Sequence, residues 1–199
     1  MAEVKLKKKI CLKRKEKPAE FVFTKYIKIK LLWKKMTMND PDLCVFFKTK
    51  DGQVGGVFSS MFRQKKSDMG SLEEFPYMEH MGDNIERSEG NESVLEQINV
   101  SNLDNIDTAN VVVLDCSTPR EGEYADLAQA RGSGYVEIQS SEGDYFEIAI
   151  DPDKSGIIYH VCSIKNRDGI NSVVNEGVMM DLGTAFERIP GFSLICVCE

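Results

Sequence analysis

Short segments in which apolar and polar residues alternate, separated by turn residues, dominate this sequence. Residues 27–31 read Ile-Lys-Ile-Lys-Leu, and residues 134–139 read Gly-Tyr-Val-Glu-Ile-Gln. Side chains of a β-strand point alternately to the two faces of a sheet, so a period of two predicts strands with one buried face. The Gly, Asn, Asp and Ser residues between the segments favour tight turns. We therefore predict an all-β fold, a two-sheet antiparallel β-sandwich with one or two short helices.

The same patterns predict individual elements. Residues 134–139 and 145–150 form a predicted hairpin, and helices are expected only at residues 126–131 and 178–186. The apolar run at residues 193–198 is predicted to be a closing strand. Alternation within the strands also predicts core positions, which are Val45, Phe47, Val111, Val113, Ile148 and Ile150.

Length and charge favour a single domain that contains its basic N-terminal strands. The chain has 199 residues, enough for one sizeable core, and we assign residues 1–199 to one domain. Residues 1–35 hold 13 Lys or Arg residues against 3 Asp or Glu residues, whereas the whole chain has a net charge of −7. The strands predicted within residues 4–33 are expected to be integral. Their lysines either lie beside acidic residues of the same molecule, the reading that we favour, or bind an anionic partner.

The sequence predicts a cytoplasmic protein with reduced thiols. It contains no run of about 18–20 apolar residues that would span a bilayer, and its basic start is not followed by an apolar signal segment. The six cysteines include no Cys-x-x-Cys pair, and most lie in apolar runs. Cys44, Cys116, Cys162 and Cys196 are expected to be small buried hydrophobic residues, and the single tryptophan, Trp33, is expected to pack in the core.

Catalytic motifs are missing from the sequence. There is no Gly-x-Ser-x-Gly elbow, no phosphate-binding loop and no dinucleotide fingerprint. His80 lies near Asp83, but a histidine in a predicted loop is expected to be solvated. We therefore predict that the protein is not an enzyme.

Two acidic segments predict a site for a hard cation. Residues 82–92 crowd acidic and amide side chains around two glycines, and Asp40 and Asp42 precede an apolar strand with the spacing that puts both on one side. Convergent carboxylates repel one another unless a cation lies among them, and Ca²⁺ takes six to eight oxygen ligands. The alternative is a solvated acidic loop.

Five short motifs occur in an order and spacing that resemble a known family. They are Asp40-Pro41-Asp42-Leu43, Lys50-Asp51-Gly52, Gly82-Asp83-Asn84, Gln97-Ile98-Asn99-Val100 and Asn102-Leu103-Asp104. Together they resemble the TerD domain of bacterial tellurite-resistance and general stress proteins, and most closely its TerA-like branch. The resemblance extends over residues 4–199, while the signature itself rests on residues 40–52 and 82–100.

The resemblance implies a calcium site and also marks where this chain differs. The implied ligands are Asp40, Asp42, Asp83, Asn84, Ile85 (through its carbonyl), Glu92 and Glu96. The family has a glycine at the position of Arg87 and acidic residues at the positions of Val94 and Leu95. Fewer carboxylates then face the ion, so the resemblance implies weakened calcium binding here.

The resemblance further implies a non-enzymatic stress-response module that acts through protein partners. The implied partners are other tellurite-resistance or TerD-family proteins, including membrane-bound members, while nucleic acid is not an expected partner. The alternative function is a metal-independent interaction scaffold, whose basic N-terminal strands bind an anionic partner such as nucleic acid or a membrane surface.

Overall fold

The structure is a computed structural model that describes most of the chain. It covers residues 9–14, 17–22, 26–34, 41–86, 92–115, 126–141, 145–167 and 170–196. Within these ranges, the side chains of residues 21, 22, 34, 83–86, 92–95, 129, 130 and 196 are not described.

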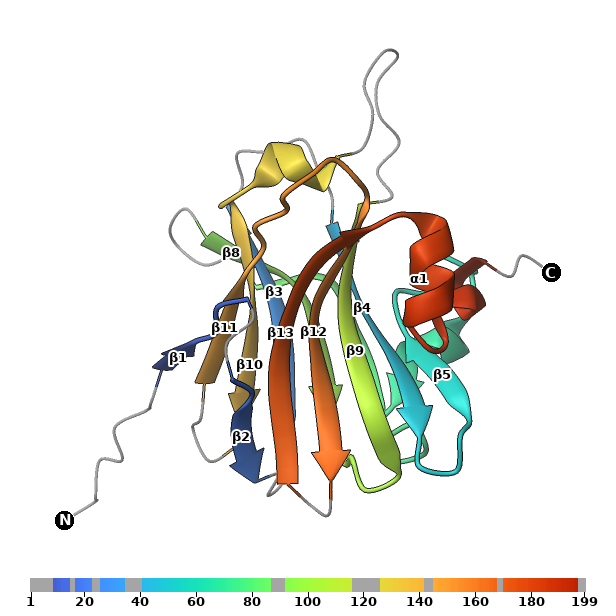
Figure 1. The fold of residues 1–199 in the computed structure, drawn as a ribbon. Coiled ribbons are helices and arrows are strands. Elements are labelled where there is room, and N and C mark those ends of the chain that lie inside the picture. Colours follow the sequence, from blue (N-terminus) through green and yellow to red (C-terminus); the bar gives the residue numbers. More distant parts are fainter. Residues whose placement is uncertain are drawn as a thin grey trace.

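Thirteen described strands form two sheets that pack face to face (Figure 1). The seven-stranded sheet has the order β1 (Lys9–Cys11), β11 (Tyr145–Ala149), β10 (Gly134–Ser140), β3 (Ile27–Lys34), β8 (Glu92–Val100), β7 (Met78–Glu86) and β6 (Gly70–Ser71). The six-stranded sheet has the order β2 (Ala19–Val22), β13 (Ile170–Met180), β12 (Ile158–Arg167), β9 (Ile106–Asp115), β4 (Pro41–Thr49) and β5 (Val54–Val57). Neighbouring strands are antiparallel, except that β1 and β11 are parallel. The predicted all-β, two-sheet antiparallel sandwich is confirmed.

Most of the core lies between the two sheets. Alternate residues of each strand point into it, and the six predicted core positions are all at most 3% exposed. Strand β3 follows the same rule: Ile27, Ile29, Leu31 and Trp33 are buried, while Lys28 and Lys30 on the other face are half-buried. Because β3 pairs with β10 on one side and β8 on the other, this basic strand is an interior strand of its sheet.

A second apolar cluster covers the outer face of the six-stranded sheet. Helix α1 (Leu182–Arg188) and the 3₁₀ helix η3 (Phe192–Cys196) pack there, at the red end of the chain in Figure 1. Phe46 of β4 contacts Phe192 at a ring-centroid distance of 5.1 Å. Strand β4 is therefore buried on both faces, by the inter-sheet core on one side and by this cluster on the other.

The predicted helical and closing segments need correction. β13 continues to Met180, and α1 begins only after Asp181, whose carboxylate accepts the backbone N–H of Thr184 and caps the helix. The helix predicted at residues 126–131 is the 3₁₀ helix η2 (Leu127–Ala130). The predicted strand at residues 193–198 is wrong where the structure describes it, since η3 occupies Phe192–Cys196 and packs Leu194 and Ile195 onto the outer cluster.

The remaining described element is the short 3₁₀ helix η1 (Lys66–Met69), within the connection between β5 and β6. Arg63 binds the carboxylate of Asp68 in η1 through two nitrogens, and its other terminal nitrogen donates to the carbonyl of Leu194. This arginine therefore ties the connection to η3. No helix in the described part of the chain is both long and apolar enough to span a bilayer.

Candidate functional site

Several of the predicted ligand residues lie near the start of β4, where a side chain of one sheet contacts the backbone of the other. Asp42 and Leu43 are at the start of β4 in the six-stranded sheet, while Glu96 lies on β8 in the seven-stranded sheet. In the pairing of β7 with β8, the Cα of Asp83 lies opposite that of Glu96. The fold thus brings the start of β4 next to the paired strands β7 and β8, which come much later in the sequence.

The carboxylate of Glu96 links the two sheets. Its side chain is buried, with the residue only 3% exposed, and its Oε2 accepts the backbone N–H of Leu43. The same oxygen lies 3.4 Å from Nε2 of His80. Burying a carboxylate is costly unless hydrogen bonds or opposite charge compensate for lost water, and the Leu43 N–H provides part of that compensation.

His80 is buried in the sandwich, and the prediction that it is solvated is wrong. It is 1% exposed and lies on β7 two residues after the core residue Met78, on the same face of the strand. Its Nδ1 accepts the backbone N–H of Gly82 at 3.1 Å, so in the neutral ring Nε2 carries the proton. This nitrogen lies 3.4 Å from the Glu96 carboxylate but makes no hydrogen bond of good geometry with it. The period-two spacing from Met78 was the sequence signal that could have placed this side chain.

The pairing of β7 with β8 is irregular on both sides of Asp83. Register shifts occur between His80 and Asp83 and again between Asp83 and Glu86. Gly82 has a φ of +88°, in the left-handed region that glycine adopts without strain. Such irregularities leave backbone groups outside the regular hydrogen-bond ladder and bend the strand, as β-bulges do next to functional sites.

The other predicted ligands are described in part or not at all. Asp42 is half-buried at the start of β4. Asn84 and Ile85 belong to β7 and Glu92 to β8, so the acidic segment is strand on both sides, not a loop from residue 82 to 92. The side chains of Asp83, Asn84, Ile85 and Glu92 are outside the description, and Asp40 lies outside the described residues altogether.

The donor chemistry at this site fits a hard cation. Asp42 and Glu96 offer carboxylate oxygens, the ligands that Ca²⁺ prefers. Among the side chains that the structure describes, no group of three or more His, Cys, Asp or Glu residues is arranged to hold a metal ion. Any complete shell of ligands must therefore include side chains beyond this set, such as those of Asp83 and Glu92.

A second buried histidine lies on the outer face of the six-stranded sheet. His160 of β12 is 7% exposed. Its register partner on β9 is Val112, whose own partner on β4 is Cys44. Val112 and Cys44 both belong to the outer apolar cluster, so His160 lies on the same face. Burial lowers the pKa of His160 below its ordinary value, while the nearby Glu176 carboxylate opposes that shift and Lys165 adds to it. Ser163 donates a hydrogen bond to the same Glu176 carboxylate.

The described thiols give no sign of a redox or metal role. Cys44 and Cys162 are fully buried in apolar surroundings, as predicted, and burial raises the pKa of the Cys162 thiol. Cys11 is exposed on β1. A buried thiol with a raised pKa carries little thiolate, which is the reactive form, so Cys162 acts as a packing residue. The fully buried Cys44 packs in the outer cluster.

Comparison of the chain with known proteins adds no identification. It matches no family model, no curated protein and no solved structure.

Proposed function

We propose that the protein is a non-enzymatic calcium-binding module that acts through protein partners. The observation that supports this most is the reach of Glu96 from β8 to the backbone of Leu43, beside Asp42, with the backbone of Asp83 opposite Glu96. The acidic motifs that predict a cation site from the sequence are separated by about 40 residues, and nothing in local sequence requires them to meet. Their meeting supports one shared site.

A cation at this position has a physical role that fits the fold. It would offset repulsion among the carboxylates and hold the end of the β7–β8 hairpin against the start of β4. The ordered surface would then be recognised by a partner. From the family resemblance, we propose as partners other proteins of the tellurite-resistance and TerD type, in a bacterial stress response.

Calcium binding should be measured by calorimetric titration of metal-stripped protein. With fewer carboxylates than the family pattern, we expect a Kd on the order of 10⁻⁵ to 10⁻³ M. Because the ion would bind the folded state only, calcium should also stabilise the protein and raise Tm. At a calcium concentration of a hundred times Kd, the added free energy of unfolding is about 2.7 kcal/mol.

Matched variants locate the site. Asp42→Ala and Asp83→Ala should each remove the calcium-induced rise in Tm, because each deletes a carboxylate of the proposed ligand set. Asp107→Ala is the control, because this exposed aspartate lies far from the start of β4. Asp107 is near the first residue of β9, whereas Asp115 at the other end of β9 is the register partner of Pro41. No heat of binding and no rise in Tm at millimolar calcium would refute the proposal.

The metal-independent scaffold would then take its place, although the packing of the basic strands favours it less. Lys9 of β1 forms an ion pair with Glu147 at 2.8 Å, and Lys30 of β3 lies opposite Glu137 of β10 in the strand register. Part of the basic charge is therefore balanced within the sheet. Binding to anionic vesicles that weakens steeply with salt would be the positive evidence for this alternative.

A further inference from the structure

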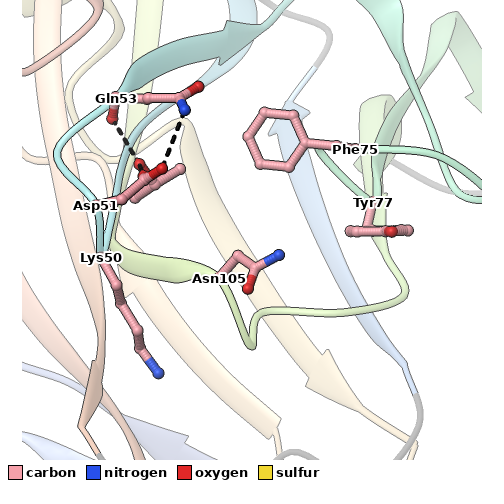
Figure 2. Close-up of a pocket in the computed structure, with 7 residues that line it drawn as sticks. Lys50, Asp51, Gln53, Phe75, Tyr77 and Asn105 are labelled. Carbon is pink, nitrogen blue, oxygen red and sulfur yellow. Dashed lines mark hydrogen bonds between the residues drawn. The ribbon is translucent and has the colours of Figure 1, made fainter.

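A pocket lies at the opposite end of β4 from the acidic site. It has a volume of about 390 Å³ and is open to solvent (Figure 2). Its lining residues come from the turn after β4, the segment before β7 and the turn before β9; they are Thr49, Lys50, Asp51, Gln53, Phe75, Tyr77 and Asn105. From Asp42 to Thr49, β4 rises by about 24 Å, so the two sites share a strand but no residue.

Hydrogen bonds between the three segments hold the pocket in shape. The backbone N–H of Lys50 donates to the carbonyl of Asn105 at 2.9 Å, which ties the first segment to the third. The N–H of Ser101 donates to the carbonyl of Tyr77 at 2.8 Å, and its hydroxyl donates to the carbonyl of Leu72 at 2.7 Å, which ties the second segment to the third. A site held in this way loses little conformational entropy when a ligand binds.

Two aromatic residues form one side of the pocket. Phe75 is 48% exposed, although it packs edge-to-face on the core residue Phe47 with a ring-centroid distance of 5.6 Å. Tyr77 has a φ of +59°, a left-handed conformation that is unfavourable for an aromatic residue. Strained backbone of this kind persists only where the surroundings impose it and is concentrated at functional sites.

Polar groups form the facing side. The hydroxyl of Thr49 and the amide of Gln53 both donate to the Asp51 carboxylate, the latter at 3.0 Å. The Thr49 hydrogen bond is the main reason that the pKa of Asp51 lies below its ordinary value, so the carboxylate is a fixed acceptor at neutral pH. Figure 2 shows Asp51 and Gln53 facing Phe75 and Tyr77 across the pocket, with the amide of Asn105 below them, while Lys50 extends away from the Phe75 ring.

We propose that this pocket binds a saccharide through one sugar ring, with its C–H face on Phe75 and Tyr77 and its hydroxyls on Asp51, Gln53 and Asn105. A sugar combines an apolar ring face with neighbouring hydroxyls that both donate and accept. A carboxylate and two amides can pair with such hydroxyls, because the carboxylate accepts while each amide both donates and accepts. The inference does not rest on the calcium site.

Two other ligand classes fit less well. An alkylammonium cation would use Asp51 and the aromatic rings but would leave both amides unused, and the neighbouring Lys50 would weaken its attraction. A small anion would use Lys50 but would face the Asp51 carboxylate. The volume lies near the lower end of the range of about 300–1,000 Å³ that is typical of ligand pockets, which suits a ligand of one or two rings.

Titration of ¹⁵N-labelled protein with simple glycosides, followed by NMR, tests the proposal. The probes are methyl α-D-mannopyranoside, methyl α-D-glucopyranoside, methyl β-D-galactopyranoside and N-acetylglucosamine. Because the pocket is open and the contacts are few, we expect a Kd on the order of 1 mM for the best of them. The side-chain amide signals of Gln53 and Asn105 should shift with the same saturation curve as the backbone amide of Gly52.

Three variants and their controls assign the binding to this pocket. Asp51→Asn and Asn105→Ala should each weaken the best glycoside by about tenfold, the loss that corresponds to one good hydrogen bond. Asp104→Asn is the control, because Asp104 is exposed in the same turn as Asn105 but does not line the pocket. Phe75→Ala should weaken binding similarly, with Phe186→Ala on α1 as the exposed aromatic control.

Clear outcomes would overturn the proposal. One is that no glycoside shifts these signals at tenfold the expected Kd, about 10 mM. Another is that tetramethylammonium shifts them at that concentration while the glycosides do not, which would assign the pocket to cations. A third is that the control variants weaken glycoside binding as much as the pocket variants do. Each variant should keep the wild-type spectrum away from its own site, so that unfolding is distinguished from lost binding.

Discussion

The two ends of β4 treat polar side chains in opposite ways. Where β4 begins, Glu96 and His80 are 3% and 1% exposed, lie 3.4 Å apart, and each accept a hydrogen bond from a backbone N–H. Where β4 ends, Asp51 and Gln53 stay exposed, and backbone hydrogen bonds between turns hold them in place. Burial converts a polar group into a structural element, whereas exposure on a fixed backbone leaves it available to a ligand. Substitutions of the buried Glu96 and His80 at the first end should therefore change stability, and those of the exposed Asp51 and Gln53 at the second end should change glycoside binding.

The largest effect is expected for Glu96→Ala. The buried N–H of Leu43 would lose its acceptor and the buried His80 would lose the carboxylate beside it, which together should cost about 3 kcal/mol of unfolding free energy. Glu96→Gln should cost less, because its amide oxygen can still accept from Leu43. The measurement is urea unfolding, with Glu79→Ala on the same hairpin as the control, expected within about 0.5 kcal/mol of wild type. A loss no larger than that of the control would contradict the structural role of Glu96.

Acid should lower the stability of the folded protein through His160, which lies near the start of β4 in the six-stranded sheet. Burial lowers the pKa of His160 in the folded protein, so as pH falls through 6.5 the unfolded chain takes up this proton first. Stability therefore decreases below that pH, by an amount that the neighbouring Glu176 reduces. Tm measured between about pH 8 and about pH 5 should fall less in His160→Gln than in wild type. Identical pH profiles for the two proteins would show that His160 is not responsible.

The fold class was predictable because period-two alternation is a local record of which face of a strand is buried. Val45, Phe47, Val111 and Val113 are buried as that pattern predicts, and the hairpin of β10 and β11 was recognised from the same signal. The end of the chain was not predictable in this way. An apolar run at residues 193–198 fits either a strand or a buried short helix, and packing against the outer face of the six-stranded sheet decides for η3.

The candidate sites were predictable only as far as local sequence carries information. The acidic segments were visible, but the burial of Glu96 depends on a contact with Leu43 of the other sheet, which no local pattern encodes. His80 was assigned to solvent because the acidic loop was expected to begin near it, whereas β7 runs to Glu86. The pocket at the other end was missed entirely, because its lining comes from three turns that meet only in the fold.

Relieving the backbone strain of Tyr77 should raise stability, opposite in sign to the effect of Glu96→Ala. Tyr77→Asn places a residue that tolerates a positive φ at this position, so we expect a gain on the order of 1 kcal/mol. The same variant should bind glycosides more weakly, because it removes one aromatic ring from the pocket. Urea unfolding measures the first effect and NMR titration the second. A loss of stability would indicate that packing of the ring outweighs the strain.

The smallest expected effect is the coupling between the two ends. Sites separated by more than about 7–10 Å that share no contact usually have additive effects within about 0.5 kcal/mol. The ends of β4 are about 24 Å apart, and the strand between them is buried on both faces, so it has no alternative packing through which one end would bias the other. The change in unfolding free energy of the double variant Glu96→Gln/Tyr77→Asn should therefore equal the sum of the two single changes. A coupling free energy above about 1 kcal/mol would show that β4 transmits a structural change between the acidic site and the pocket, and the two ends would then have to be treated as one site.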